Sequence, residues 1–354
     1  MESQVKPVPV ADLRALVLQI MERCGVSAED GQTTADVLVT TDTWGIFTHG
    51  TKPLYLYTRR LRAKGLKPRG RPHVLDEGPA WAVVDGDSSI GMVTGVYAMK
   101  LALAKSAASG VALVVVRNSC TIGAAGYYAS LAAGQGQLGI AVCNAPPNVA
   151  APGSRGPVLG SNPFAFGAAS ATGGAMVLDI ATSEAAGGKI DAAAAEGRSV
   201  PNTWLVGAEG QPVTDPNLFL KSQAFLAPMA GHKGYGIGLM IEVLCALSGG
   251  MMRDRVRSFA DPPGNPTHQC HAFLAINPGA FLGEGVFPAR LDDLFQGIRA
   301  VPAVPGCHVK IPGEMEEGMR RKALAEGIVF PAEVLRLLKV AAVENGCPVP
   351  PFLA

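Results

Sequence analysis

The chain has 354 residues, more than one hydrophobic core usually organises, so we expect two compact lobes or one large domain with an appendage. Thirty lysines and arginines face 29 aspartates and glutamates, for a net charge of +1, which argues against a basic nucleic-acid-binding face and an acidic tail. Only 17% of the residues are charged and 48% are hydrophobic, so we expect a second subunit to cover part of the surface.

The seven cysteines are an odd number without a C-x-x-C pair, which is typical of reduced thiols in a cytoplasmic protein. His268-Gln269-Cys270-His271 is the one local group of metal-ligand side chains, and without a partner elsewhere it predicts no metal site. The amino terminus lacks a charged start followed by an apolar run, and no apolar run reaches the ~20 residues of a membrane span. We therefore expect neither a signal peptide nor a membrane segment.

Three helices are predicted at the start of the chain. Val10–Cys24 carries apolar residues at helical spacing and is followed by Gly25, a residue typical of a helix C-cap. Ser27 is a suitable N-cap for a second helix that continues through about Thr40. Leu54–Lys64 predicts the third, with three arginines near the end where cations suit the helix dipole.

The character of the chain changes at a proline- and glycine-rich stretch, Gly65–Pro79, where we place a boundary. Beyond it, helices alternate with β-branched runs of the kind that is buried on both faces of a sheet, which predicts an α/β domain with a mixed sheet. A polar, turn-rich segment is expected over Ala192–Gln211, and two final helices over Met315–Ala325 and Ala332–Val343. The elements predicted between the boundary and those last helices are strand Ala80–Asp85, helix Thr94–Ser109, strand Val111–Val116, helix Tyr127–Ala133, strands Leu138–Cys143, Pro163–Ala168 and Met176–Ile180, helix Gly234–Ser248, strand His271–Ile276 and helix Leu291–Ala300.

A glycine-rich turn, Gly231–Gly238, opens the longest of the later helices. Its glycines allow positive φ angles, and the free amides of the first helical turn could bind an anion beside His232 and Lys233. The alternative is that glycine gives clearance for close helix packing. The spacing is not G-x-G-x-x-G and no clear strand precedes the turn, so an ordinary Rossmann fingerprint is absent.

His49 is the first candidate for chemistry, because it lies at a glycine break between two predicted helices, beside Lys52, Arg59 and Arg60. A histidine at such a position can exchange a proton near neutral pH. The alternative is a loop histidine whose ring is bonded to the backbone.

Two polar segments follow buried strands. Arg117–Gly123 comes after one strand, and Asp179–Ser183, with Gly187-Gly188-Lys189 beyond it, comes after another. Ligands often bind at the carboxyl ends of strands in α/β sheets, and an aspartate, two hydroxyls and a lysine could bind ribose and phosphate. Strand termination and turn formation also explain these residues.

Together these segments resemble the malate/L-lactate dehydrogenase family of NAD(P)-dependent oxidoreductases, which is unrelated in fold to the ordinary lactate dehydrogenases. That family also includes ureidoglycolate and sulfolactate dehydrogenases, diketogulonate reductases and piperideine-2-carboxylate reductases. Eight segments keep the family's order and spacing from about residue 10 to 345: Thr48-His49-Gly50, Val84-Asp85-Gly86, Asn118-Ser119 with Gly123–Tyr128, Gly160-Ser161-Asn162-Pro163, Leu178–Ser183, Gly188-Lys189-Ile190, Gly231–Gly238 and Pro312-Gly313-Glu314.

The resemblance implies a homodimer with active sites near the subunit interface. It implies a non-Rossmann, mixed-sheet NAD(P)-binding domain over residues 76–309 and a helical lobe formed by residues 1–75 and 310–354. His49 would exchange a proton with the substrate oxygen. The residues implied to bind the cofactor are Asp179, Ile180, Ala181, Thr182, Ser183, Lys189, His232, Lys233, Gly234, Pro312, Gly313 and Glu314. Those predicted to bind the substrate are Thr48, Lys52, Asn118, Thr121 and Arg155.

Two positions depart from the family. Pro53 stands where the family usually has an arginine that can clamp a carboxylate, and Lys52 offers only a point charge beside it. Thr121, preceded by Cys120, replaces a second histidine and cannot relay protons as one. Because the cofactor segments are intact, we expect NAD(P) binding combined with an unusual substrate.

The sequence thus predicts a cytoplasmic oxidoreductase that uses NAD or NADP to interconvert a small 2-hydroxy acid and a 2-oxo acid. Its partners would be a carboxylic acid substrate and a second copy of the chain, without nucleic acid or membrane. One alternative is an NAD(P)H-dependent cyclic imino-acid reductase. The other is a family member repurposed for ligand binding or non-redox chemistry, which Pro53 and Thr121 keep open.

Overall fold

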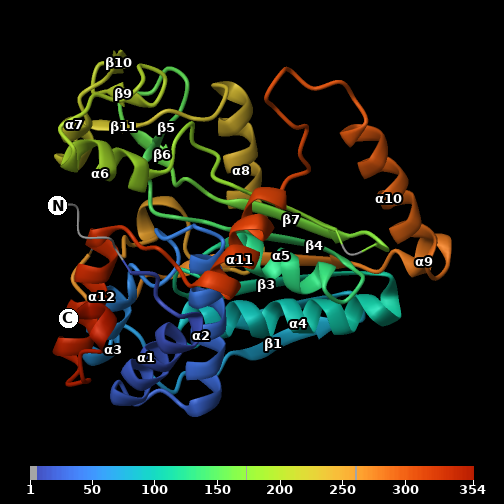
Figure 1. The fold of residues 1–354 in the computed structure, drawn as a ribbon, viewed down its shortest axis with the longest axis horizontal. Helices are drawn as coiled ribbons and strands as arrows, with labels where there is room; N and C mark the ends of the chain where they lie inside the picture. The colour runs from blue at the N-terminus through green and yellow to red at the C-terminus, as the bar shows by residue number, and fades with distance from the viewer. Residues whose placement is uncertain (1–5, 173, 260) are drawn as a thin grey trace.

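The computed structural model describes residues 6–172, 174–259 and 261–354, and a seven-stranded sheet forms its centre (Figure 1). Strands β2 and β3 pair in parallel, and every other neighbouring pair is antiparallel, so the prediction of a mixed sheet is confirmed. In spatial order the strands are β1 His73–Gly78, β2 Trp81–Asp85, β3 Val111–Ser119, β12 Gln269–Ile276, β4 Leu138–Cys143, β7 Phe164–Ala169 and β8 Ala175–Ile180.

Helices cover both faces of this sheet. α4 (Gly91–Ser109) and α5 (Ala125–Ala133) pack on one face, and α8 (His232–Ala246) packs on the other. Alternate residues of β3 point to opposite sides, so Val114 and Val116 join the core under α4 and α5, whereas Val115 joins the core under α8. This burial on both faces is why the strand is a continuous β-branched run.

The two ends of the chain form one helical lobe, which Figure 1 shows as blue and red helices side by side. Its core contains Leu13, Val17 and Ile20 from the first helix. Residues from near the carboxyl end of the chain belong to the same core. The hydroxyl of Ser27 accepts the amide hydrogen of Asp30 (3.2 Å) and caps the second helix as predicted. The helices of this lobe are α1 Val10–Arg23, α2 Ala28–Thr43, α3 Leu54–Arg62, α11 Glu314–Glu326 and α12 Ala332–Glu344.

A second, smaller sheet lies apart from the main one, with α6 (Gly187–Ala195) and α7 (Pro216–Leu220) beside it (Figure 1). We expected Ala192–Gln211 to be irregular, but α6 ends inside this range and one strand lies within it. Strands of two or three residues are too short to show an alternation of apolar and polar residues, which is why the hydrophobic pattern did not predict them. In spatial order they are β10 Pro212–Val213, β9 Leu205–Gly207, β11 Ala224–Leu226, β5 Val149–Ala150 and β6 Pro157–Leu159.

Several boundaries differ from the predicted ones. β3 continues through Ser119, so the first polar segment begins within the strand, and β11 shortly precedes the glycine-rich turn. α4 begins at Gly91 rather than Thr94; a Cβ at residue 91 would overlap the carbonyl oxygen of Thr121, so tertiary packing here overrides the low helix propensity of glycine. β1 falls inside the expected boundary stretch, and the division at residues 75/76 stays a prediction. The remaining helices are α9 Gly279–Leu282, α10 Val286–Arg299 and the 3₁₀ turns Arg253–Arg255 and Pro351–Leu353.

The seven cysteines are all free thiols. Within the described ranges, no helix is both long enough and apolar enough to cross a membrane.

Candidate active site

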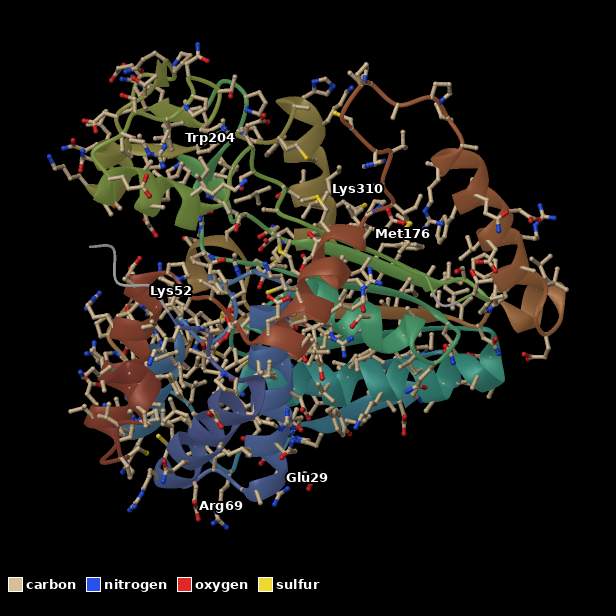
Figure 2. All side chains as sticks on the ribbon, viewed as in Figure 1. Glu29, Lys52, Arg69, Met176, Trp204 and Lys310 are labelled. Carbon is tan, nitrogen blue, oxygen red and sulfur yellow. The ribbon has the colours of Figure 1, made fainter. Side chains whose placement is uncertain are left out.

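A cavity of about 790 Å³ lies where the helical lobe, the main sheet and the small-sheet lobe meet. A second hollow of about 590 Å³ adjoins it and shares six lining residues with it: Thr48, His49, Lys52, Gly188, Ala195 and Glu333. Figure 2 shows Lys52 at the edge of the helical lobe, below the lobe that carries Trp204. The parts of the chain that line the larger cavity include the turn between α2 and α3, the turn after β3, the end of β8, the start of α6 and the start of α12.

His49 lies in the turn between α2 and α3, with its side chain exposed at the cavity wall. Its Nδ1 is 2.9 Å from the hydroxyl of Thr48, and no other hydrogen bond to the ring forms within the described part of the chain. The Nε2 atom is therefore the ring nitrogen left for a ligand. Desolvation by the surrounding cavity wall lowers the pKa of His49 below its ordinary value, which favours the neutral imidazole.

The turn that carries His49 is tied to α2 by Asp42, a residue that sequence reasoning missed. The Oδ2 atom of Asp42 accepts hydrogen bonds from the backbone amide of Thr51 (3.0 Å) and from its hydroxyl (2.6 Å). Burial raises the pKa of Asp42 to about 8. The available signal was an acidic residue in the last turn of a helix, where the helix dipole disfavours it.

Three of the predicted cofactor-binding residues, Asp179, Ala181 and Lys189, line the cavity. The Oδ2 atom of Asp179 accepts the amide hydrogen of Gly126 (2.7 Å), and burial raises the pKa of Asp179 to about 6. The ammonium of Lys189 lies 6.0 Å from the ring centre of Trp204.

The start of α6 lies directly against the turn that carries His49. A Cβ at Gly188 would come within 2.6 Å of the Thr48 methyl group, so a larger residue there would require the Thr48 side chain to move. The second polar segment is thus adjacent to the histidine, which the sequence alone could not show.

Three further cofactor candidates bond within the protein beside the cavity. The hydroxyl and the amide of Thr182 both donate to the carbonyl oxygen of Ser161, at 3.0 and 2.9 Å. The hydroxyl of Ser183 donates to Ala185 (2.8 Å), and Ile180 pairs with Phe164 at the end of β8. These side chains shape the loop behind Ala181, and their predicted contact with a cofactor stays a prediction.

In the glycine-rich stretch at the start of α8, Gly234 provides clearance, whereas Gly231 and Gly236 have no atom within 4 Å of a Cβ position. A Cβ at Gly234 would lie 2.5 and 2.6 Å from backbone atoms of Met229 and 2.6 Å from the carbonyl oxygen of Thr182. His232 and Lys233 are exposed in the first turn of α8 and are not among the residues that line the cavity. At Gly234, close packing therefore explains the glycine.

Pro312-Gly313-Glu314 lies along the outer edge of the main sheet. The amide of Val177 in β8 donates to the carbonyl oxygen of Pro312 (3.0 Å), and Gly313 has a φ of 94° with no room for a Cβ against Val177. Glu314 pairs with Arg299 of α10. This segment is outside the cavity, and its role toward a cofactor stays a prediction.

Among the predicted substrate-binding residues, Thr48, Lys52 and Thr121 line the cavity. Pro53, which stands where the family usually has an arginine, lines the adjoining hollow. The ammonium of Lys52 is 3.2 Å from a carboxylate oxygen of Glu333, the second residue of α12. The one lysine beside the proline is therefore already paired.

Asn118 and Arg155 are not brought to the cavity. The amide of Asn118 donates to Asp85 (3.0 Å), and its side-chain oxygen accepts from the Ser88 hydroxyl (2.9 Å). Arg155 forms an exposed ion pair with Glu209 in the small-sheet lobe.

The arginines that we expected beside His49 are engaged elsewhere. Arg59 pairs with Glu344 of α12. Arg60 is buried, and its guanidinium donates to the backbone carbonyls of four residues in the segment before β12: Ser258, Phe259, Asp261 and Asn265. Spacing on a helix did not reveal this, because the acceptors are about two hundred positions away in the sequence.

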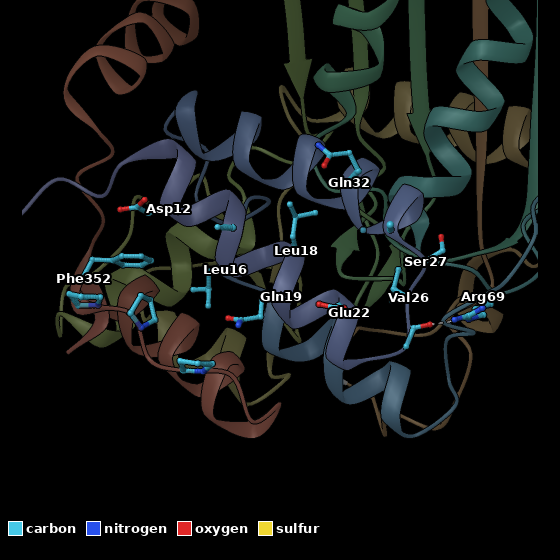
Figure 3. Close-up of a pocket in the computed structure, with 17 residues that line it drawn as sticks. Asp12, Leu16, Leu18, Gln19, Glu22, Val26, Ser27, Gln32, Arg69 and Phe352 are labelled. Carbon is cyan, nitrogen blue, oxygen red and sulfur yellow. Dashed lines mark hydrogen bonds between the residues drawn. The ribbon is translucent and has the colours of Figure 1, made fainter.

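Another cavity, of about 1140 Å³, lies elsewhere, between α1, the start of α2 and the carboxyl-terminal prolines (Figure 3). Arg69 reaches its edge and donates to the carbonyl oxygen of Gly25 (3.3 Å). None of the predicted site residues, all of which are described, lines this cavity. Size alone therefore does not mark the chemical site.

Known proteins are similar to this chain over nearly its whole length. A family model for malate/L-lactate dehydrogenase matches residues 8–339. The L-sulfolactate dehydrogenase of Methanocaldococcus jannaschii is 36% identical over 312 residues, which cover 87% of this chain and 89% of that protein. A pyrroline-2-carboxylate/piperideine-2-carboxylate reductase of Pseudomonas putida is 30% identical over 338 residues, covering 95% and 97% of the two chains. The structure of a malate dehydrogenase from Entamoeba histolytica superposes with a TM-score of 0.92 at 29% identity, covering 98% of this chain and 100% of that one.

Proposed function

Because the chain belongs to the malate/L-lactate dehydrogenase family of NAD(P)-dependent oxidoreductases, we propose that it interconverts a small 2-hydroxy acid and the matching 2-oxo acid. The observation that carries this proposal is the position of His49. Its ring lines the same cavity as Asp179, Ala181 and Lys189, three residues proposed to bind the cofactor.

The residues present fit a nicotinamide dinucleotide. The cavity volume of about 790 Å³ is in the range of cofactor sites, and its lining includes several small residues that leave room for a flat ring: Gly123, Ala145, Ala181, Gly187 and Gly188. The bound cofactor would supply or accept the hydride. We assign ribose and phosphate binding to Asp179 and Lys189, with Thr182, Ser183, the first turn of α8 and Pro312–Glu314 as further proposed contacts.

His49 would move the proton. The Thr48 hydroxyl can donate to Nδ1 or accept from it, so the ring can carry a single proton on Nε2 or leave that atom free. With the Thr48 hydroxyl accepting from Nδ1–H, a free Nε2 can accept the proton of an alcohol during oxidation, and the imidazolium formed in this way can return that proton from Nε2 during reduction. General acid–base help of this kind contributes on the order of 10²–10⁴ in rate.

Lys52 is the proposed partner of the substrate carboxylate. It is paired with Glu333, so a bound substrate would have to compete with that carboxylate. An ammonium holds a carboxylate less rigidly than a guanidinium fork does, which supports a substrate bound differently from that of family members with the arginine.

The test is a fluorescence titration of the purified protein with NADH and with NADPH, followed by addition of a panel of 2-oxo acids. We expect one nucleotide to bind and a 2-oxo acid to oxidise it. Failure of both nucleotides to bind would overturn the proposal.

Reduction of a cyclic imino acid is a second candidate. Asp191 and Glu333 line the hollow with Lys52, and the pKa of Asp191 is raised by burial and by Glu333, against the lowering effect of Lys52. Two carboxylates around one ammonium suit a cationic iminium better than a dianion. Assaying a cyclic imine beside a 2-oxo acid of the same length separates the two candidates by kcat/KM.

We also propose that the chain forms a homodimer in the cytoplasm. Leu239, Val243 and Leu247 recur at every fourth position of α8 or just beyond its end and are 42%, 60% and 59% exposed, which leaves an apolar face without a cover. The free thiols suit a reducing compartment. Light scattering should give the mass of a dimer for the wild type, and Val243→Glu should weaken it; a monomeric wild type would contradict the proposal.

A further inference from the structure

The turn that carries His49 is held by a buried carboxyl group on the helix before it. Asp42 is 1% exposed, and its Oδ2 atom accepts both donors of Thr51, the amide at 3.0 Å and the hydroxyl at 2.6 Å. Thr51 is itself fully buried. The backbone two residues beyond His49 is therefore fixed to the end of α2.

The other oxygen of Asp42 fits against a glycine. Within the described part of the chain, Oδ1 of Asp42 has no hydrogen-bond partner, and it occupies the place that a Cβ would take at Gly50. The carboxyl group thus contacts the turn through both of its oxygens, by hydrogen bonds at Thr51 and by close packing at Gly50.

The same turn is closed from the other side by its own backbone. The amides of His49 and Gly50 both donate to the carbonyl oxygen of Ile46, at 3.1 and 3.2 Å. With Thr51 held by Asp42, the main chain is fixed before and after the imidazole, and the Thr48 hydroxyl then orients Nδ1.

An aspartate at this position does not stabilise α2. It lies in the last turn of α2, where the negative end of the helix dipole opposes a carboxylate. Burial without a cation is a further cost to the charged form. The contacts with Gly50 and Thr51 are what the structure gains from it.

We propose that Asp42 is a positioning residue for His49, holding the Gly50-Thr51 backbone so that the imidazole faces the cavity. The inference rests on the proposed role of His49 in proton transfer. Asp42 acts through shape and hydrogen bonding rather than through charge, and it does not touch the substrate.

The protonation state agrees with this role, because burial raises the pKa of Asp42 to about 8 and the group is largely neutral at neutral pH. An asparagine has the same shape, and its amide oxygen can accept both Thr51 donors. Asp42→Asn is therefore the conservative variant, and Asp42→Ala removes the contact.

The experiment compares Asp42→Ala, Asp42→Asn and Gly50→Ala with the wild-type protein. We expect Asp42→Ala and Gly50→Ala to lower kcat at least about tenfold while KM and the dissociation constant of NAD(P)H change less than about threefold. Asp42→Asn should restore kcat to within about threefold of the wild type. Gly297→Ala, at an exposed helical glycine with no atom near its Cβ position, is the matched control and should behave as wild type.

A second readout does not depend on turnover. The chain has six histidines, so ¹³C-labelled histidine gives a countable set of ring signals, and His49→Asn identifies the one from His49. In Asp42→Ala that signal and its titration midpoint should move, while the other histidines keep theirs and circular dichroism shows a folded protein.

The outcomes are distinguishable. A folded Asp42→Ala with wild-type kcat and an unmoved His49 signal would overturn the positioning role. So would a loss of kcat that Asp42→Asn shares, because charge would then be the requirement. A wild-type protein that turns over no substrate but whose His49 signal moves in Asp42→Ala would support the positioning and count against the proposed function.

Discussion

Two turns of this molecule carry almost the same residue types, His49-Gly50-Thr51-Lys52 after α2 and His232-Lys233-Gly234 at the start of α8. In the first, glycine makes room for the Asp42 side chain and the histidine lines the cavity. In the second, glycine makes room for backbone, and the histidine and lysine remain exposed outside the cavity. A glycine beside a histidine therefore predicts a tight turn, and only the neighbours of that turn in space decide whether it serves a site.

The largest expected effect separates the two histidines. His49→Ala should lower kcat at least about 100-fold, because the other ionisable side chain of the turn, Lys52, is paired with Glu333, while the affinity for NAD(P)H stays within about twofold. His232→Ala should leave kcat within about threefold and change at most the cofactor affinity. Steady-state kinetics measure kcat and a fluorescence titration measures the affinity for NAD(P)H. A fully active His49→Ala enzyme would show that His49 is no more important for turnover than His232.

Two glycines of the second turn should differ in how their replacement by alanine changes the free energy of unfolding. Gly234→Ala places a methyl group against the Met229 and Thr182 backbones and should lower the free energy of unfolding by about 1–3 kcal/mol. Gly236→Ala, where no atom lies within 4 Å of the added carbon, should raise it by up to about 1 kcal/mol. Urea unfolding of the two variants gives the values, and equal effects would show that packing is not what selects glycine at residue 234.

The first turn should show a pH dependence of stability that comes from Asp42. Its pKa rises from 3.8 to about 8 on folding, so this contribution to stability is complete below pH 3.8 and is lost as the pH rises to about 8. Asparagine has no proton to lose. The free energy of unfolding of Asp42→Asn minus that of the wild type should therefore grow with pH across this window, by at most about 1.4 kcal/mol per pH unit. If the difference in free energy of unfolding between the two proteins did not change with pH, Asp42 would not be the group that titrates.

The smallest expected effect concerns Lys52. Glu333→Gln frees the ammonium for a substrate carboxylate and should lower KM by up to about fivefold, the range expected for a partly exposed ion pair. Glu326→Gln removes the partner of Lys322 on α11 and serves as the control, with KM unchanged. An unchanged KM in both variants would mean that Lys52 does not bind the carboxylate.

Much of the fold could be predicted because its signals are local. The helical spacing of Leu13, Val17 and Ile20, the cap at Ser27 and the β-branched run of β3 depend on residues within a few positions of one another. The small sheet was missed, since strands of two or three residues are too short to show alternation.

The site was predicted less completely, because its contacts span the chain. His49 and Lys189 were both candidates from sequence, but Asp42 has no motif, and its partner Thr51 is recognised only after the turn has folded back. Arg60 was expected in a basic group near His49, and burial under the segment before β12 gives it a structural role instead.

By itself the sequence determined the family, the mixed α/β class, most helices and strands, and the candidate histidine. Periodicity and motif order can be read from the order of the residues alone. The tertiary structure decided which candidates share a cavity, which glycine turn packs against backbone, and that Lys52 already has a partner. The physical reason is that hydrophobic patterning acts between near neighbours in the chain. A site is made by side chains that long-range packing brings within a few ångströms.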